Sequence, residues 1–161
     1  MTHEAEVEGI GVGVGDEGIG APAVVLRVRD ELVPIFITPD QAQSMQLAIE
    51  EVPFERPLTH DLLVEMINDF GGAFDRVRID DLSDGTFYAK VDAELYGDGD
   101  RQKFVFDARP SDAIAIALRV DCPIMVGDAI IDEAGRDPDL FEVEEGGRGP
   151  DVFDDPEEEG F

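Results

Sequence analysis

The sequence contains little that is basic or redox-active, and it has no tryptophan. It has a single cysteine, Cys122, and two histidines, His3 and His60. One cysteine excludes an internal disulfide and any zinc site built on several cysteines. A chain without disulfides is typical of a reducing compartment, so we expect a cytoplasmic protein.

Long apolar segments are absent as well. No stretch approaches the roughly 20 apolar residues that a membrane-spanning helix needs. The chain starts with the acidic segment MTHE, whereas a signal peptide needs a basic start followed by an apolar stretch. The sequence therefore predicts no signal peptide, no membrane span and no membrane partner.

Negative charge dominates what is present. Asp and Glu number 39 against 12 Lys and Arg, which gives a net charge of −27, yet 43% of the residues are hydrophobic. Disorder requires low hydrophobicity, so this composition indicates a folded domain. Self-repulsion strains a compact state in dilute salt, but in molar salt the Debye length falls to about 3 Å. We interpret the protein as halophilic, adapted to a salt-rich cytoplasm.

The same charge bears on nucleic-acid binding. An acidic surface argues against phosphate contacts, because counterion release drives much of their affinity. Molar salt largely removes that contribution for every protein. The lack of a basic patch is therefore weaker negative evidence here than in dilute salt.

The hydrophobic pattern predicts an α+β fold. Alternation is clearest at residues 87–95, where the hairpin signal Asp84-Gly85 precedes the strand. Three helices are expected, beginning at caps Thr38, Thr59 and Ser111. The expected strands cover residues 4–8, 24–28, 32–37, 77–79, 87–95, 102–108 and 123–126. Consecutive hairpins favour one compact domain over residues 1–145 with a mixed, largely antiparallel sheet. Residues 146–161 read as an acidic, disordered tail.

Residues 13–18 match the pattern GxGxxG. A dinucleotide site requires these glycines to open a helix whose N-terminus holds a phosphate. Here Asp16 and Glu17 would face the phosphates, and Pro22 interrupts any helix. We therefore expect a flexible loop or a bulged hairpin over residues 9–22.

A histidine and an aspartate stand together in the segment RPLTHDLL at residues 56–63. His60 and Asp61 fall in the first turn of a predicted helix, where free backbone N–H groups and the positive dipole end lie. An imidazole there can move a proton or bind a metal. A surface histidine beside a dipole-stabilising aspartate explains the pair equally well.

A second polar segment, DARPSDAIA at residues 107–115, joins a strand to an apolar helix. Arg109 ahead of a helix N-terminus is a ready site for phosphate. Asp112 and Arg119 fall on one stripe of that helix. An internal Arg–Asp network at the junction is the alternative. A serine hydrolase is not indicated, because no GxSxG motif surrounds Ser111.

These two segments resemble the bifunctional nuclease family, whose members are proposed DNases and RNases. DGTFYA at residues 84–89, VPIFI at 33–37 and CPIMV at 122–126 are similar to further blocks of that family. The resemblance covers about residues 5–135. Gln41 stands where members often carry Glu, and residues 9–22 and the segment after Gly146 lie outside the family pattern.

The resemblance implies a nonspecific nuclease that hydrolyses phosphodiester bonds of DNA, RNA or both, in a domain that can form homo-oligomers. Carried onto this chain, the catalytic candidates are His60, Asp61, Arg109 and Asp112. Arg109 and Ser111 are the candidates for substrate binding. Asp61, Asp107 and Asp112 offer oxygen ligands for Mg²⁺ or Mn²⁺, and a metal-free mechanism stays open. The alternative is a non-enzymatic module that binds an anion or a protein and uses the same residues structurally.

Overall fold

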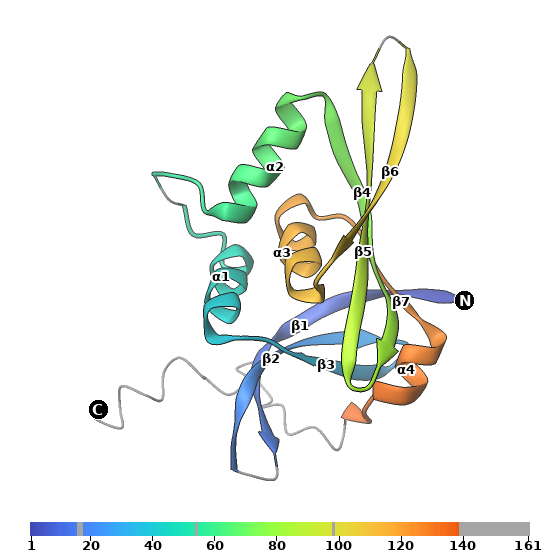
Figure 1. Ribbon diagram of the computed structural model, residues 1–161. Coiled ribbons are helices and arrows are strands. Elements are labelled where there is room, and N and C mark those ends of the chain that lie inside the picture. Colours follow the sequence, from blue (N-terminus) through green and yellow to red (C-terminus); the bar gives the residue numbers. More distant parts are fainter. Residues whose placement is uncertain (16–17, 54, 98, 139–161) are drawn as a thin grey trace.

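The computed structural model describes residues 1–15, 18–53, 55–97 and 99–138 of the chain (Figure 1). The expected tail, residues 146–161, lies outside the described residues and stays a prediction. The strands are β1 (Thr2–Gly15), β2 (Gly18–Val28), β3 (Glu31–Phe36), β4 (Gly72–Ser83), β5 (Thr86–Gly97), β6 (Asp100–Ala108) and β7 (Ile124–Gly127). The helices are α1 (Pro39–Ile49), α2 (Thr59–Asp69), α3 (Pro110–Val120) and α4 (Asp128–Ala134).

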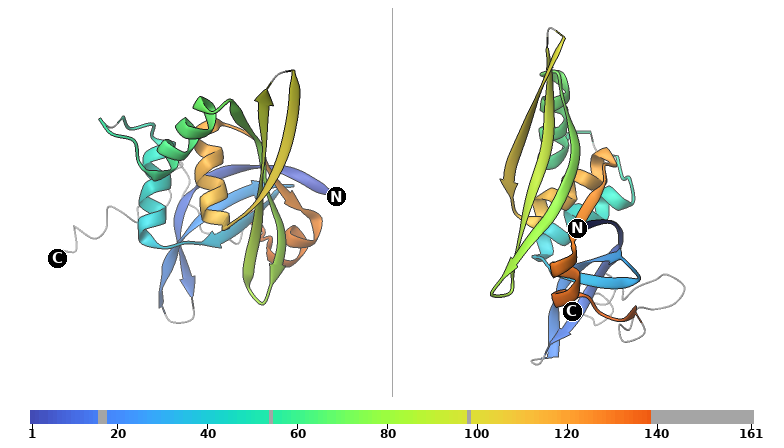
Figure 2. Two further views of the ribbon diagram at one scale, coloured as in Figure 1. Left: turned by 45° about the horizontal axis from the view of Figure 1, so that its top comes forward. Right: turned by 90° about the vertical axis from the view of Figure 1, so that its right-hand side faces the viewer.

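The seven strands form one mixed sheet in the order β3-β2-β1-β7-β4-β5-β6. Every neighbouring pair is antiparallel except β4 and β7, which run parallel. The β1–β2 and β5–β6 hairpins extend at opposite ends of the molecule (Figures 1 and 2). The predicted α+β class and largely antiparallel sheet are confirmed.

Local sequence signals explain several element boundaries. The Asp84-Gly85 turn between β4 and β5 has positive φ at both residues, 54° and 79°, as a two-residue hairpin requires. Thr38 caps α1 through its hydroxyl, which accepts from the Gln41 amide at 3.2 Å. The Gln41 side chain accepts from the Thr38 amide at 2.8 Å, which completes the predicted capping box.

Helix α3 lies at the centre of the core, between the sheet and helices α1 and α2 (Figure 1). Ser111 and all residues from Ala113 to Ala117 are buried. They pack against buried strand residues such as Val77 and Val91. The predicted burial of this helix is confirmed, and it fixes the position of the helix start.

Four local expectations were wrong. The N-caps of α2 and α3 are Leu58 and Arg109 rather than Thr59 and Ser111. Helix α4 was not predicted, because seven residues are too few to show a periodic pattern. His3, expected in a frayed terminus, lies in β1, where Nε2 contacts Asp128 Oδ1 at 2.6 Å.

Residues 9–15 and 18–22 of the glycine-rich segment lie in β1 and β2, which have register shifts between Val7 and Gly9 and between Val12 and Val14. The bulged hairpin, one of the two alternatives for residues 9–22, is therefore the observed one. No helix in the described part of the chain is long and apolar enough to cross a membrane.

Helix α2 and strand β6 expose several large apolar side chains each. Helix α2 has no buried residue, and its Leu62 and Met66 are 47% and 45% exposed. Phe70, which follows the last turn as the C-cap, is 72% exposed. On β6, Val105 is 58% and Phe106 is 50% exposed. The apolar face predicted for α2 exists, but neighbouring elements cover little of it.

Candidate functional site

The first turns of α2 and α3 bring the two polar sequence segments together. Helix α2 packs on α3, so His60 and Asp61 on one helix reach residues 109–119 of the other. Each helix begins after an extended residue, Leu58 or Arg109, that lacks a side-chain cap bond. Free backbone N–H groups at such starts favour negative charge nearby.

Asp112 lies at the centre of the first cluster. Its Oδ1 atom is 2.9 Å from His60 Nε2, and its Oδ2 atom accepts from Arg109 Nε at 2.8 Å. The side chains of His60 and Asp112 are 20% and 32% exposed, whereas that of Arg109 is 68% exposed. One carboxylate therefore joins a sheltered imidazole to a guanidinium that reaches into solvent.

The environment of Asp112 favours its charged form. Burial raises the pKa of this carboxyl group, but the hydrogen bonds from Arg109 and His60 outweigh burial and hold the pKa below its ordinary value. In turn, Asp112 raises the pKa of Arg109, first through their hydrogen bond. Asp112 therefore stays ionised across the range in which a histidine exchanges protons.

Asp61 belongs to a neighbouring but separate pair. Its Oδ1 atom accepts from Arg119 Nε at 2.7 Å, and its Oδ2 atom accepts from the Leu58 amide at 3.1 Å. The Arg119 side chain is only 7% exposed and also donates to the Ala115 carbonyl and the Ser44 hydroxyl. These contacts connect α1, α2 and α3, so Asp61 stabilises the packing of the three helices.

Two further candidates, Asp107 and Ser111, differ in their exposure. Asp107 is 83% exposed on β6, and its nearest ion-pair partner is Lys90 Nζ on β5, at 3.9 Å. Ser111 is 6% exposed in the first turn of α3. Burial disfavours direct contact of Ser111 with a substrate, whereas Asp107 is open to solvent.

The carboxylates do not gather as a metal site requires. Asp61 and Asp112 each use both oxygens in the contacts given above, and Asp107 pairs with Lys90. Within residues 1–15, 18–53, 55–97 and 99–138, no three His, Cys, Asp or Glu side chains lie close enough to hold one ion. The residues do not fit the expected Mg²⁺ or Mn²⁺, so we derive no step through a metal.

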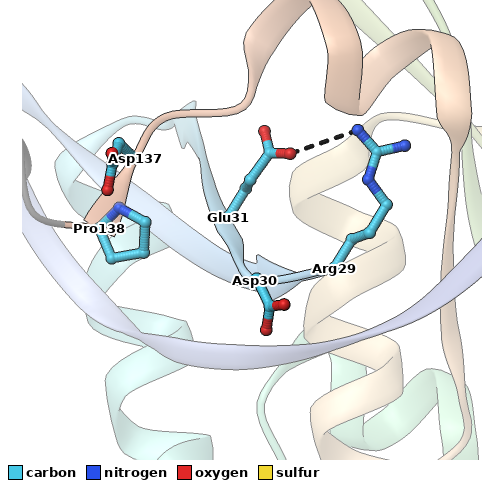
Figure 3. Close-up of a pocket in the computed structure, with 5 residues that line it drawn as sticks. All are labelled: Arg29, Asp30, Glu31, Asp137 and Pro138. Atoms are coloured by element: carbon cyan, nitrogen blue, oxygen red, sulfur yellow. Dashed lines mark hydrogen bonds and ion pairs between the residues drawn. The ribbon is translucent and has the colours of Figure 1, made fainter.

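A shallow hollow lies elsewhere, beside the turn between β2 and β3 (Figure 3). It is lined by Arg29, Asp30, Glu31, Asp137 and Pro138. Arg29 donates to Asp128 and Asp132, and more weakly to Glu31. Its charge is thus engaged by carboxylates, so the described residues that line the hollow offer no available cation for a phosphate.

Sequence reasoning missed a second ionic network on the opposite face of the sheet. Asp92 on β5 is 9% exposed and accepts from Arg76 at 2.6 Å and from Arg78 at 2.7 and 2.9 Å. Burial raises the pKa of Asp92, yet the hydrogen bonds from the two arginines hold it below its ordinary value. Charged residues alternate with apolar ones in residues 76–80 and 88–94, and this pattern could have indicated a charged face on the two strands.

The fold and the site define an α+β domain with a His–Asp–Arg cluster at the meeting point of two helix starts. Residues 24–139 match the family model of the bifunctional nuclease domain, so the chain belongs to that family. The matched segment contains every residue of the cluster.

Relatives support the same assignment. An uncharacterised protein of Mycobacterium tuberculosis is 39% identical over 132 residues, which are 81% of this chain and 76% of that protein. Bifunctional nuclease 2 of Oryza sativa is 34% identical over 68% of this chain and 34% of its own length. Bifunctional nuclease 1 of Arabidopsis thaliana is 31% identical over 65% of this chain. The matched region is about one third of each plant protein.

Proposed function

We propose that the protein is a nuclease that hydrolyses phosphodiester bonds of DNA, RNA or both without strong sequence preference. Family membership supports this class of activity. The observation that carries the proposal is the position of Asp112, which contacts His60 at 2.9 Å and Arg109 at 2.8 Å. One carboxylate thus orients both an acid–base group and a phosphate ligand.

His60 acts as the acid–base group. Because the Nε2 atom of His60 is hydrogen-bonded to Asp112, Nδ1 is the ring nitrogen that accepts a proton from the attacking water. The oxygen of water bonds to phosphorus, the bond to the leaving oxygen breaks, and that oxygen receives a proton from the imidazolium. Asp112 holds the ring in place and stabilises its charged form, as the aspartate does in a serine protease triad.

Arg109 binds the scissile phosphate. Its Nε atom is committed to Asp112, which leaves the Nη atoms to contact the phosphate oxygens as negative charge builds up on them. The backbone N–H groups of the first turn of α3 add to the anion-binding character of this position. In this proposal Asp61 positions α2 through Arg119 and does not touch the substrate.

A non-enzymatic role is the second candidate. The charged members of both clusters are paired with one another, as in a network that only stabilises the packing of α2 on α3. In that case Arg109, the most exposed member, would bind an anion or an acidic partner without cleavage.

We also propose that this activity takes place in a salt-rich cytoplasm. The excess of 39 acidic over 12 basic residues supports this location, since hydrated carboxylates keep a surface soluble when salt screens their repulsion. Under those conditions short-range contacts such as that of Arg109 matter more than long-range attraction to nucleic acid.

Digestion of plasmid DNA and of unstructured RNA tests the proposal. The full chain is incubated with each substrate in molar KCl, with EDTA and with added Mg²⁺ or Mn²⁺. Cleavage that the His60→Ala variant lacks supports the mechanism, and cleavage lost in EDTA shows that a metal takes part. No cleavage of either substrate by folded protein under any of these conditions would favour the binding module.

A further inference from the structure

Strand β6 ends the sheet, and its outer edge is uncovered in the described part of the molecule. It is the last strand in the sheet order. All residues from Asp100 to Asp107 are exposed. The apolar run at its centre is Phe104, Val105 and Phe106, which are 39%, 58% and 50% exposed. A long apolar edge strand is a template for pairing with another strand.

The other edge of the sheet is protected, which makes the contrast informative. Strand β3 carries Pro34 at its middle, and its Leu32 exchanges backbone hydrogen bonds of 2.9 and 2.7 Å with Arg136. Half of its side chains, those of Leu32, Val33 and Ile35, are buried. Proline and a covering segment are the usual means of blocking an edge, and β6 has no proline.

The backbone groups that β6 presents can be identified. The Tyr96 amide donates to the Gly71 carbonyl at 2.9 Å, so the backbone N–H and C=O groups of Tyr96 face β4. Along a strand, the backbone N–H and C=O groups of successive residues face opposite neighbouring strands. The backbone groups of Leu95 therefore face β6, where its partner is Gln102. It follows that the N–H and C=O groups of Arg101, Lys103, Val105 and Asp107 point away from β5, toward the open edge.

We propose that β6 pairs antiparallel with β6 of a second copy of this chain, about a two-fold axis at Val105. In this register Lys103 faces the partner's Asp107, and the same contact recurs by symmetry. Val105 meets the partner's Val105 on that face of the sheet. On the other face, Phe104 meets the partner's Phe106. Opposite charges and aromatic rings thus pair across the strands, each of which stabilises a sheet.

The charges of β6 select both the partner and the register. Moving the axis to Lys103 would set two lysines against each other, and moving it to Phe104 would place Lys103 opposite an apolar side chain. Residues 100–107 carry two acidic and two basic side chains, whereas the whole chain carries a net −27. Two copies therefore meet at a segment without net charge, and salt screens the repulsion between the rest of the two acidic chains.

The oligomeric state tests this pairing, independently of any nuclease activity. Light scattering on the full chain, in KCl sufficient to keep it folded, should give twice the chain mass of 17.6 kDa. Val105→Lys places two like charges at the axis and should give the monomer mass. The matched control is Phe36→Lys, which changes a 59% exposed residue on β3 and should leave the dimer intact.

A charge exchange tests the register. Lys103→Glu and Asp107→Lys should each raise the dimer dissociation constant by about tenfold or more, a coupling of roughly 1 kcal/mol for each of the two symmetric pairs. The double variant should restore dimerisation, because the pair is rebuilt in the opposite sense. Failure of the double variant to recover would overturn the axis at Val105.

Amide hydrogen exchange on the unmodified protein does not depend on how any variant folds. The amides of Lys103, Val105 and Asp107 should become protected as protein concentration rises. A monomer at every concentration overturns the proposal. So does protection of these amides in the monomer, which would show that another segment of the same chain covers β6.

Discussion

Arg119 Nε donates to Asp61 Oδ1 at 2.7 Å, and this bond joins the last turn of α3 to the first turn of α2. The guanidinium is nearly buried, since the side chain is 7% exposed, while the carboxylate is 38% exposed. The pair holds His60, the adjacent residue on α2, over Asp112. Asp61 therefore affects the candidate site through its position on the helix.

Loss of this carboxylate should destabilise the fold. Asp61→Ala leaves the buried Arg119 charge without its partner and should lower the free energy of unfolding by about 2–3 kcal/mol, below the full cost of breaking a buried pair because Asp61 is partly solvated. Urea denaturation measures the change. Glu65→Ala, at an exposed position on the same helix, should change stability by less than about 0.5 kcal/mol. Equal effects of both substitutions would contradict the assignment.

The two histidines provide a matched test of catalysis. Each contacts an aspartate through Nε2, His60 at 2.9 Å and His3 at 2.6 Å. If His60 moves the proton, His60→Ala should reduce cleavage by ~10²–10⁴-fold while circular dichroism stays unchanged. His3→Ala should retain cleavage, because its partner Asp128 lies at the start of α4. Equal activity of the two folded variants would remove His60 from the mechanism.

Arg109→Lys separates a phosphate clamp from a simple positive charge. Lysine keeps the charge but cannot contact Asp112 and a phosphate with separate nitrogens of one planar group. Cleavage should fall at least about tenfold while stability changes by less than about 1 kcal/mol, since the Arg109 side chain is 68% exposed. Single-turnover rates and thermal melts on the same preparation measure both quantities. Full activity in the lysine variant would argue against a bidentate role.

Asp112 should make stability depend on pH in the acid range. Its folded-state pKa lies below the ordinary value of 3.8, so its interactions contribute their full stability above about pH 4. That contribution is lost as the pH falls through the folded-state pKa. Asp112→Asn should cost about 1 kcal/mol at neutral pH, and the difference from the parent should shrink below pH 4. A difference that stays constant down to the acid transition would contradict this linkage.

Salt should stabilise the whole chain. Raising KCl from dilute buffer to molar concentration should increase the melting temperature, because screening reduces repulsion within a net charge of −27. Sucrose is the control, since it favours burial of surface without screening charge. An equal rise in sucrose and in KCl, or no rise in KCl, would contradict adaptation to high salt.

Some local sequence signals predicted local structure correctly. The Thr38 and Gln41 capping box and the Asp84-Gly85 turn each depend on contacts within a few residues, and each appears as expected. Helix α3 was predicted as buried because its apolar residues surround most of its circumference. Signals of this kind need no knowledge of the rest of the fold.

The pairing of the site residues was beyond the reach of local pattern. His60 and Asp112 are 52 positions apart in sequence, and only the packing of α2 on α3 brings them together. Sequence suggested an internal Arg–Asp network at the start of α3 but did not identify the partner of Arg109. The strand alternation of β6 directs Asp107 toward Lys90, and the turn into α3 directs Asp112 toward Arg109.

The order of the strands has a consequence for how the chain folds. Strands β1–β3 and β4–β6 are two antiparallel units, each built from neighbouring segments, and β7 lies between them. β7 pairs with β1 through Ala5 and Ile124, and with β4 through Val77 and Ile124. Closing the loop between Ala5 and Ile124 spans most of the domain, and such distant contacts form slowly. Until β7 is in place, β1 and β4 therefore lack the strand that pairs with their inner edges.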